Sequence, residues 1–259
     1  MSPPDLDRTD ALFLDLDGTL LEIAATPDDV VVAPQLAELL VALDDALGGA
    51  VAIVSGRPIS EIDRLLEPYR GSAAGEHGAV IRYGDGNVEG LPSDVSVPSL
   101  WRESLEAAAD LLPGVLVESK PHGVTVHYRL APELGANVWR LTRALVPGDH
   151  PSFRLLPARE AVEIGLAAAS KGDAVERLFK QPSFCRRRPI FIGDDVTDEA
   201  GMRAARDLGG LGLRVAQSFG GDPAQVRAWL LQGLERMGGR LARQRLSGTD
   251  PQATPGATS

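Results

Sequence analysis

Short apolar runs alternate with helical patterns at both ends of this chain. Residues 11–15 and 50–54 read ALFLD and AVAIV, which is typical of strands buried on both faces of a parallel sheet. Leucines at helical spacing over Pro34–Leu47 predict a helix between them, and therefore a strand–helix–strand crossover. The alternation returns later, with strands expected at 189–192 and 211–215 and helices at 172–180, 197–206 and 223–237. Together the two stretches predict one doubly wound, Rossmann-like α/β sheet.

The middle of the chain follows a different pattern, in which each helix is followed by two strands. Helices are expected at 98–112 and 133–146, and strands at 115–120, 124–129, 153–156 and 161–166. Pairs of adjacent strands suit an antiparallel sheet, because a short turn can join them. The order αββαββ therefore predicts a separate α+β domain inserted into the α/β core.

Glycine-rich and polar segments suggest where this insertion begins and ends. We expect linkers at Tyr83–Gly90 and Gly165–Ser170. The core would then consist of residues 1–83 and 167–244, and the inserted domain of residues 84–166. The stretch SGTDPQATPGATS has almost no apolar side chains to bury, so residues 245–259 are predicted to be a disordered tail.

The charge balance narrows the classes of partner. The chain has 36 acidic and 26 basic residues, a formal charge of −10, so nothing gathers nucleic acid or an anionic membrane surface. A small phosphorylated substrate is compatible with this net charge, because a metal ion and a few basic side chains make a site locally positive. Cys185 is the only cysteine, which excludes an intramolecular disulfide and any multi-cysteine metal site. Residues 1–10 lack a secretory signal pattern and no apolar run approaches about 20 residues, which predicts a soluble, cytoplasmic protein.

The first expected strand ends in two carboxylates, Asp15 and Asp17, followed by Gly18 and Thr19. Residues two apart share a side of an extended chain, and ligands of open α/β sheets bind at the carboxyl edge. Such a pair favours a bound cation, and oxygen ligands favour Mg²⁺. An Asp-rich turn that caps the next segment is the alternative, and a calcium-binding helix–loop–helix fits worse because a strand precedes the motif.

Three further segments follow strands or open helices of the same predicted sheet. Ser55, Gly56 and Arg57 end the second strand, where a hydroxyl and backbone N–H groups can hold a phosphoryl oxygen, or where Ser55 simply caps a helix. Lys171 opens a helix, a position that disfavours a cation unless an anion is also there. A cluster of acids follows the strand at 189–192, more than helix capping explains; it comprises Asp194, Asp195, Asp198 and Glu199.

The order DLDGT, SGR, Lys171 and GDDVTDE resembles the haloacid dehalogenase superfamily of phosphotransferases. The segments LFLDLDGTLLEI, IVSGRP, GEHGA, VESKPHGVTVHYR, and VEI with SKG beyond it narrow the resemblance to the trehalose-6-phosphate phosphatases. The resemblance covers nearly the whole chain as far as about residue 240. It implies that the inserted domain is a cap over the active site.

The resemblance also implies roles in catalysis. Asp15 would attack phosphorus, and Asp17 would protonate the departing sugar oxygen and later deprotonate the hydrolytic water. Mg²⁺ would be held by Asp15, the carbonyl oxygen of Asp17, and Asp194, because a carboxylate attacks a phosphoryl group only when its charge is neutralised.

The remaining groups would support this centre. Ser55 and Lys171 would bind the equatorial phosphoryl oxygens. Asp198 would orient Lys171, and Asp195 and Glu199 would lie around the metal in roles that the sequence does not separate.

In the inserted domain, strand alternation places polar side chains on common faces. Glu118 and Lys120 share one face, as do Thr125, His127 and Arg129 on the next strand, and Arg159 and Glu163 on the last. A solvated outer face is one interpretation. The resemblance instead implies that five of these residues grip sugar hydroxyls: Glu118, Lys120, Arg129, Arg159 and Glu163.

One departure concerns substrate identity. The family usually follows the glutamate at 163 with a basic residue and a proline, whereas this chain has Gly165 and Leu166. Alternatives are therefore a related phosphatase acting on sucrose, glucosylglycerol or mannosylglycerate phosphate, or a non-catalytic regulatory module, which the presence of both Asp15 and Asp17 opposes. The resemblance also suggests a functional pairing with a trehalose-phosphate synthase. His77 lies in the GEHG turn, where a structural role is at least as well supported as a contact with substrate.

Overall fold

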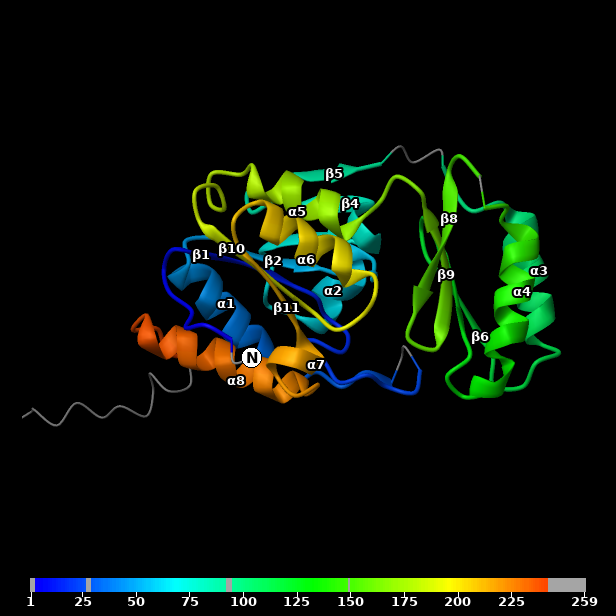
Figure 1. Ribbon diagram of the computed structural model, residues 1–259, viewed down its shortest axis with the longest axis horizontal. Coiled ribbons are helices and arrows are strands. Elements are labelled where there is room, and N and C mark those ends of the chain that lie inside the picture. The colour runs from blue at the N-terminus through cyan, green and yellow to red at the C-terminus, as the bar shows by residue number, and fades with distance from the viewer. Residues whose placement is uncertain (1–2, 27–28, 92–94, 149, 242–259) are drawn as a thin grey trace, which may run out of the picture.

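The apolar runs near the start of the chain form the centre of a seven-stranded sheet (Figure 1). The computed structural model describes residues 3–26, 29–91, 95–148 and 150–241, so the predicted tail at 245–259 lies outside the described residues. The strand order is β11-β10-β1-β2-β3-β4-β5, parallel except for β4 and β5. The bounds are β1 Asp10–Leu14, β2 Val51–Val54, β3 Ser72–Gly75, β4 Val80–Arg82, β5 Val88–Gly90, β10 Arg188–Gly193 and β11 Leu211–Arg214.

Helices cover both faces of this sheet. In Figure 1, α5 and α6 pack together on one side of it, and α1 and α8 pack together on the other. Because β1 and β2 are sandwiched in this way, every one of their residues is buried, which explains why they are apolar throughout except for Asp10, a buried carboxylate paired with Arg188. The bounds are α1 Leu36–Ala46, α2 Ile59–Leu65, α5 Lys171–Phe179, α6 Asp198–Asp207, α7 Val215–Ser218 and α8 Pro223–Arg236.

A second, four-stranded antiparallel sheet has the order β6-β7-β9-β8. Its helices α3 and α4 lie on the side away from the larger sheet, so its other face looks toward the core (Figure 1). Apolar residues such as Val124, Val126 and Val162 form a cluster of their own, whereas Thr125 and Glu163 alternate with them. The bounds are α3 Ser99–Ala109, β6 Leu116–Ser119, β7 Val124–His127, α4 Gly135–Leu145, β8 Phe153–Ala158 and β9 Ala161–Leu166, with short 3₁₀ turns η2 Glu76–Gly78 and η3 Pro132–Leu134.

The predicted fold class, a doubly wound α/β core with an inserted αββαββ cap, is confirmed. The expected linkers are corrected, because Val88–Gly90 forms edge strand β5 on the larger sheet and Gly165 lies within β9. All three residues of β5 are exposed, so no apolar run marks the strand in the sequence. The division into 1–83 with 167–244 and 84–166 stays a prediction, and its first boundary falls before a strand that pairs with the core.

Within the residues that the structure describes, we find no helix that is both long and apolar enough to cross a lipid bilayer.

The burial of β1 leads to a stability prediction. Leu12→Ala removes buried methyl groups from the centre of the sheet and should lower the free energy of unfolding by about 2–5 kcal/mol. The matched control is Leu111→Ala, the same substitution at a side chain that is 81% exposed, which should change it by less than about 0.5 kcal/mol. Urea unfolding of both variants measures the difference; equal midpoints would mean that β1 is not the centre of the core.

Candidate active site

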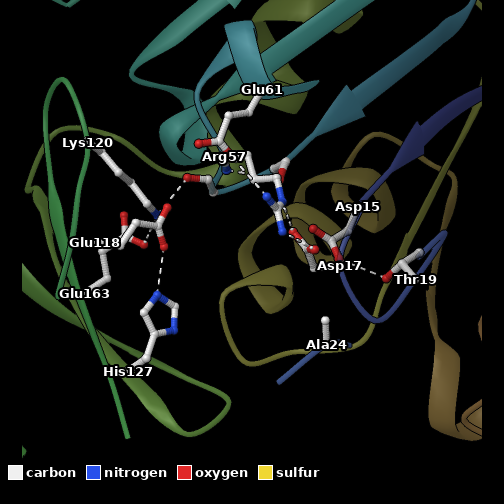
Figure 2. Close-up of polar contacts among 12 residues, drawn as sticks. Asp15, Asp17, Thr19, Ala24, Arg57, Glu61, Glu118, Lys120, His127 and Glu163 are labelled. Carbon is white, nitrogen blue, oxygen red and sulfur yellow. Dashed lines mark hydrogen bonds and ion pairs between the residues drawn. The ribbon is translucent and has the colours of Figure 1, made fainter. Parts of the chain in front are cut away.

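The carboxyl ends of β1, β2 and β10 meet at one edge of the larger sheet, directly opposite the open face of the smaller sheet. A cavity of about 160 Å³ lies between them. Figure 2 shows polar side chains of the cap across this space from the two carboxylates that follow β1. The cavity is lined by every residue that the sequence predicted for the site except Glu199: Asp15, Asp17, Ser55, Gly56, Arg57, Glu118, Lys120, Arg129, Arg159, Glu163, Lys171, Asp194, Asp195 and Asp198.

Asp15, the residue directly after β1, is a buried carboxyl held by two donors. Lys171 Nζ donates to its Oδ1 at 2.6 Å, and Thr19 Oγ1 donates to its Oδ2 at 2.9 Å. Burial raises the pKa of Asp15 well above its usual range, and the charges of Asp198 and Asp194 raise it further, although Lys171 opposes the shift. A bound cation would add to the effect of Lys171 and lower this pKa.

Lys171 bridges two carboxylates at the start of α5. Its Nζ donates to Asp198 Oδ1 at 2.5 Å as well as to Asp15. Burial alone would lower the pKa of Lys171, but the two carboxylates outweigh it and hold that pKa above its usual range. Asp198 Oδ2 accepts the backbone N–H groups of Asp194 and Asp195 at 3.0 and 2.9 Å. Asp198 therefore fixes both the ammonium group and the loop that follows β10.

An acidic cluster at this edge could hold a metal ion. One carboxylate oxygen from each of Asp15, Asp194 and Asp198 lies within 4.8 Å of the others. Burial, followed by the charges of Asp198 and Asp195, raises the pKa of Asp194 to about 6. Gly18 has φ +78°, and a Cβ there would lie 2.2 Å from Asp194 Oδ2, so only glycine allows this approach. Hard oxygen donors with unbalanced negative charge fit a divalent cation.

Asp17 is paired with an arginine from the loop after β2. Arg57 donates from Nε to Asp17 Oδ2 at 2.7 Å and from a terminal nitrogen to Oδ1 at 2.8 Å, a bidentate ion pair (Figure 2). Its third contact is with Glu61 Oε2 at 2.9 Å. Arg57 was predicted to bind substrate together with Ser55 and Gly56, but here its guanidinium is engaged by carboxylates.

The rest of this loop faces the cavity. Ser55 Oγ accepts the backbone N–H of Arg57 at 3.1 Å. Helix α2 begins at Ile59 after Pro58, without a side-chain cap, so the alternative interpretation of Ser55 as a helix cap is wrong. Its hydroxyl hydrogen stays available to a ligand in the cavity.

Glu163 is the centre of the cap's polar face. Lys120 Nζ donates to Glu163 Oε2 at 2.7 Å and to the carbonyl oxygen of Gly56 in the core at 3.0 Å (Figure 2). Thr125 Oγ1 donates to the same carboxylate at 3.2 Å. Burial would raise the pKa of Glu163, but the charges of Lys120 and His77 hold it well below its usual range. This glutamate is therefore a buried anion and a strong acceptor.

The other cap residues line the rim of the cavity. Glu118 Oε2 contacts His127 Nε2 at 2.7 Å; burial raises the pKa of Glu118, but His127 and Lys120 lower it below its usual value. Arg129 donates to the carbonyl oxygen of Ala24 in the core and to that of Arg159 at 3.0 Å. The interpretation of this face as a solvated outer face is therefore wrong, because its side chains line the cavity, as the family resemblance implied. Strand parity by itself indicated only which side chains share a face.

Sequence reasoning missed several groups. Thr19 was read as part of a turn and not as a partner of Asp15, and His77 was not included in the site although its Nε2 lies 3.3 Å from Glu163 Oε2. Glu199 pairs with Arg214, which in turn donates to the carbonyl oxygen of Asp194 at 3.0 Å. The contact of Thr19 is local, because Thr19 lies four residues after Asp15, and its hydroxyl was a signal that could have been used. The contacts of His77 and Glu199 join separate elements, and no local spacing marks them.

Comparisons with known proteins match this arrangement. The family model described as trehalose-phosphatase matches residues 13–226. A probable trehalose-phosphate phosphatase of Sinorhizobium fredii is 44% identical over 211 residues, which cover 82% of this chain and 79% of that protein. The trehalose-6-phosphate phosphatase of Escherichia coli is 34% identical over 237 residues, which cover 89% and 85% of the two chains.

A solved structure supports the fold. The C-terminal domain of Candida albicans trehalose-6-phosphate phosphatase has a TM-score of 0.74 at 18% identity, covering 88% of this chain and 93% of that one. The core, the cap and the acidic edge define a phosphatase with the haloacid dehalogenase fold. The chain belongs to the trehalose-phosphatase family.

The raised pKa of Asp194 predicts how pH affects stability and cation binding. Without metal, the contribution of Asp194 to the free energy of unfolding is greatest when its carboxyl is protonated, and that contribution is lost as pH rises through about 6. A divalent cation needs the ionised form, so the rise in Tm on adding Mg²⁺ should be larger at about pH 7.5 than at about pH 5. Near 100 times Kd the added stability should approach about 2.7 kcal/mol.

Asp194→Asn should remove most of this metal-induced shift. The matched control is Asp44→Asn, because burial raises the pKa of Asp44 to about 6 as well but Asp44 lies in α1, away from the cavity. An equal metal-induced shift in wild type and Asp194→Asn, measured by thermal unfolding, would place the cation elsewhere.

Proposed function

We propose that this chain hydrolyses trehalose 6-phosphate to trehalose and inorganic phosphate through an aspartyl-phosphate on Asp15, with Mg²⁺ as cofactor. One observation carries the proposal. A buried carboxylate that is bound by an ammonium group lies opposite a cap whose inner face is built from charged hydrogen-bonding side chains. That combination suits a phosphoryl group attached to a polyhydroxylated leaving group.

In the first step, a carboxylate oxygen of Asp15 forms a bond to phosphorus while the bond from phosphorus to the sugar oxygen breaks. Asp17 gives its proton to that oxygen, and neutral trehalose leaves. Lys171 and the Ser55 hydroxyl hold equatorial phosphoryl oxygens, where negative charge develops. In this step Lys171 exchanges part of its contact with Asp15 for the phosphoryl group.

In the second step, water attacks phosphorus and the bond to Asp15 breaks, which releases phosphate. The Asp17 carboxylate takes the proton from that water. In the resting site both oxygens of Asp17 accept hydrogen bonds from the Arg57 guanidinium. To act as the acid in the first step, Asp17 must first give up part of this contact.

The chemistry of the donors supports Mg²⁺ at the acidic cluster. The carboxylates of Asp15 and Asp194 and the carbonyl oxygen of Asp17 would hold it, and Asp198 would position Lys171 and the loop carrying Asp194. When bound, the ion neutralises phosphoryl charge so that an anionic nucleophile can approach. Asp195 supports the loop, since its Oδ1 accepts the N–H of Val196 at 2.7 Å.

The cap residues Glu118, Lys120, Arg129, Arg159 and Glu163 would bind sugar hydroxyls. Arg159 is exposed at the rim, whereas Lys120 and Glu163 are buried in the wall of the cavity. Gly165, where the family usually carries a basic residue, has no side chain, and a Cβ added there would lie 3.0 Å from Leu156 Cδ1 and 3.6 Å from Glu163 Oε1. We also propose a cytoplasmic location and functional pairing with a synthase that supplies the sugar phosphate.

The nucleophile leads to a first catalytic prediction. Asp15→Asn should abolish turnover while the protein still folds, because an amide does not attack phosphorus. Asp17→Asn, the same substitution two residues away, should lower turnover of trehalose 6-phosphate by about 10²- to 10⁴-fold. With an aryl phosphate, whose leaving group needs little protonation, phosphoenzyme formation should fall much less. Near-normal turnover by Asp15→Asn contradicts the covalent mechanism.

A substrate panel tests the proposed specificity. Wild type should prefer trehalose 6-phosphate over glucose 6-phosphate and over sucrose, glucosylglycerol and mannosylglycerate phosphates. Glu118→Ala and Glu163→Ala should each lower kcat/KM for trehalose 6-phosphate by roughly 10- to 150-fold, since each removes hydrogen bonds to a charged group. Hydrolysis of a small aryl phosphate should fall by much less.

These glutamates are informative because removing a negative charge cannot weaken attraction to a phosphate. A wild-type preference for another member of the panel would reassign the substrate. Unchanged selectivity in both variants would mean that the cap face does not read the sugar.

A further inference from the structure

Two consecutive residues after β3, Glu76 and His77, hold an unusual backbone conformation. Their φ angles are +48° and +58°, in the left-handed region that non-glycine residues rarely occupy. Such a conformation costs free energy and persists only where surrounding contacts enforce it. Both side chains are buried at the boundary between core and cap.

The backbone of this turn is tied to the phosphoryl-binding loop. His77 N donates to the carbonyl oxygen of Ser55 at 2.9 Å, and Glu76 N donates to that of Arg57 at 3.0 Å. The imidazole ring packs directly on Gly56, where an added Cβ would lie 2.7 Å from His77 Nε2. The position of the ring is therefore set by the same loop that carries Ser55.

The side chains of the turn reach the cap instead. The Glu76 carboxylate accepts the backbone N–H of His122 at 2.8 Å and contacts His122 Nδ1 at 2.9 Å, at the tip of the β6–β7 hairpin. His77 Nε2 lies 3.3 Å from Glu163 Oε2. His77 Nδ1 is buried and has no hydrogen-bond partner among the described residues, so the ring is held on its polar side by the contact of Nε2 with Glu163.

We propose that His77 is a positioning residue that sets specificity by fixing Glu163 relative to the phosphoryl-binding loop. Resting on the proposed function, this inference assigns His77 no contact with the reacting atoms. Its Nε2–H holds one oxygen of Glu163, while its backbone holds the Ser55 loop. Lys120 also joins Glu163 to the carbonyl oxygen of Gly56, but through a flexible side chain, whereas the His77 ring is rigid. The ring therefore sets the distance between the sugar-binding carboxylate and the phosphoryl site, so the cap accepts a leaving group of one length.

Two substitutions separate this role from a structural one. Asparagine adopts the left-handed conformation readily, and its side chain ends short of the Nε2 position, so His77→Asn removes the contact with little backbone strain. Glutamine places an amide nitrogen near the Nε2 position, so His77→Gln keeps a donor for Glu163. Thermal unfolding of both variants checks that each is folded.

His77→Asn should lower kcat/KM for trehalose 6-phosphate by roughly 10- to 100-fold, mainly through KM, as expected for loss of a hydrogen bond to a buried charge. Hydrolysis of an aryl phosphate should fall far less, and His77→Gln should recover most of the lost selectivity. In a double-mutant cycle, His77→Asn should add little to Glu163→Ala, because His77 acts through Glu163.

Equal losses on both substrates, or additive effects of His77→Asn and Glu163→Ala, would overturn the inference. An unchanged KM in His77→Asn would do so as well. The cycle is measured on whichever sugar phosphate wild type prefers. If trehalose 6-phosphate is not the substrate, the wild-type measurements show it. If His77 does not act through Glu163, the double-mutant cycle shows it.

Discussion

The structure depends on the compensation of charge at the buried edge of the larger sheet. Asp15, Asp194 and Asp198 gather around a single ammonium group, that of Lys171. Buried charges are tolerated only when they are paired and hydrogen-bonded, and here the carboxylates outnumber the cation. The raised pKa values of Asp15 and Asp194 express that excess. A site with this excess of negative charge contributes little to the stability of the fold, but it favours the binding of a cation and, with it, a phosphoryl group.

The cap solves a different physical problem, which is to present charged groups without exposing its own core. Its sheet buries valines against two helices on one face and carries Glu163 and Lys120 on the other. Those two groups neutralise each other in the absence of a ligand. A sugar hydroxyl can replace part of that contact, because hydroxyls both donate and accept.

Core and cap meet through a small number of directional contacts. Lys120 reaches the Gly56 carbonyl oxygen, Arg129 reaches that of Ala24, and the turn at Glu76 and His77 reaches His122 and Glu163. Such polar contacts are easily exchanged with water, unlike an apolar interface. This suits a cap that must admit a substrate and release two products.

The sequence by itself determined the fold class and most of the site. Apolar runs such as 11–15 predict buried strands directly. Parallel strands end at the same edge of a sheet, so Asp15, Ser55 and Asp194 lie together there independently of the loop conformations. Strand parity placed Glu118 with Lys120, and Arg159 with Glu163, on common faces of their own strands, and the family resemblance placed those faces over the active site. The strand faces and the shared sheet edge needed only periodicity and topology.

Tertiary structure alone decided which groups touch. The pairing of Arg57 with Asp17, of Glu199 with Arg214 and of His77 with Glu163 joins separate elements, and no local spacing encodes such distances. The exposed edge strand β5 was missed for the same kind of reason, since its pairing comes from the neighbouring β4 and not from apolar residues of its own. Periodicity reports which face of an element is buried, whereas a contact depends on where two elements meet in space.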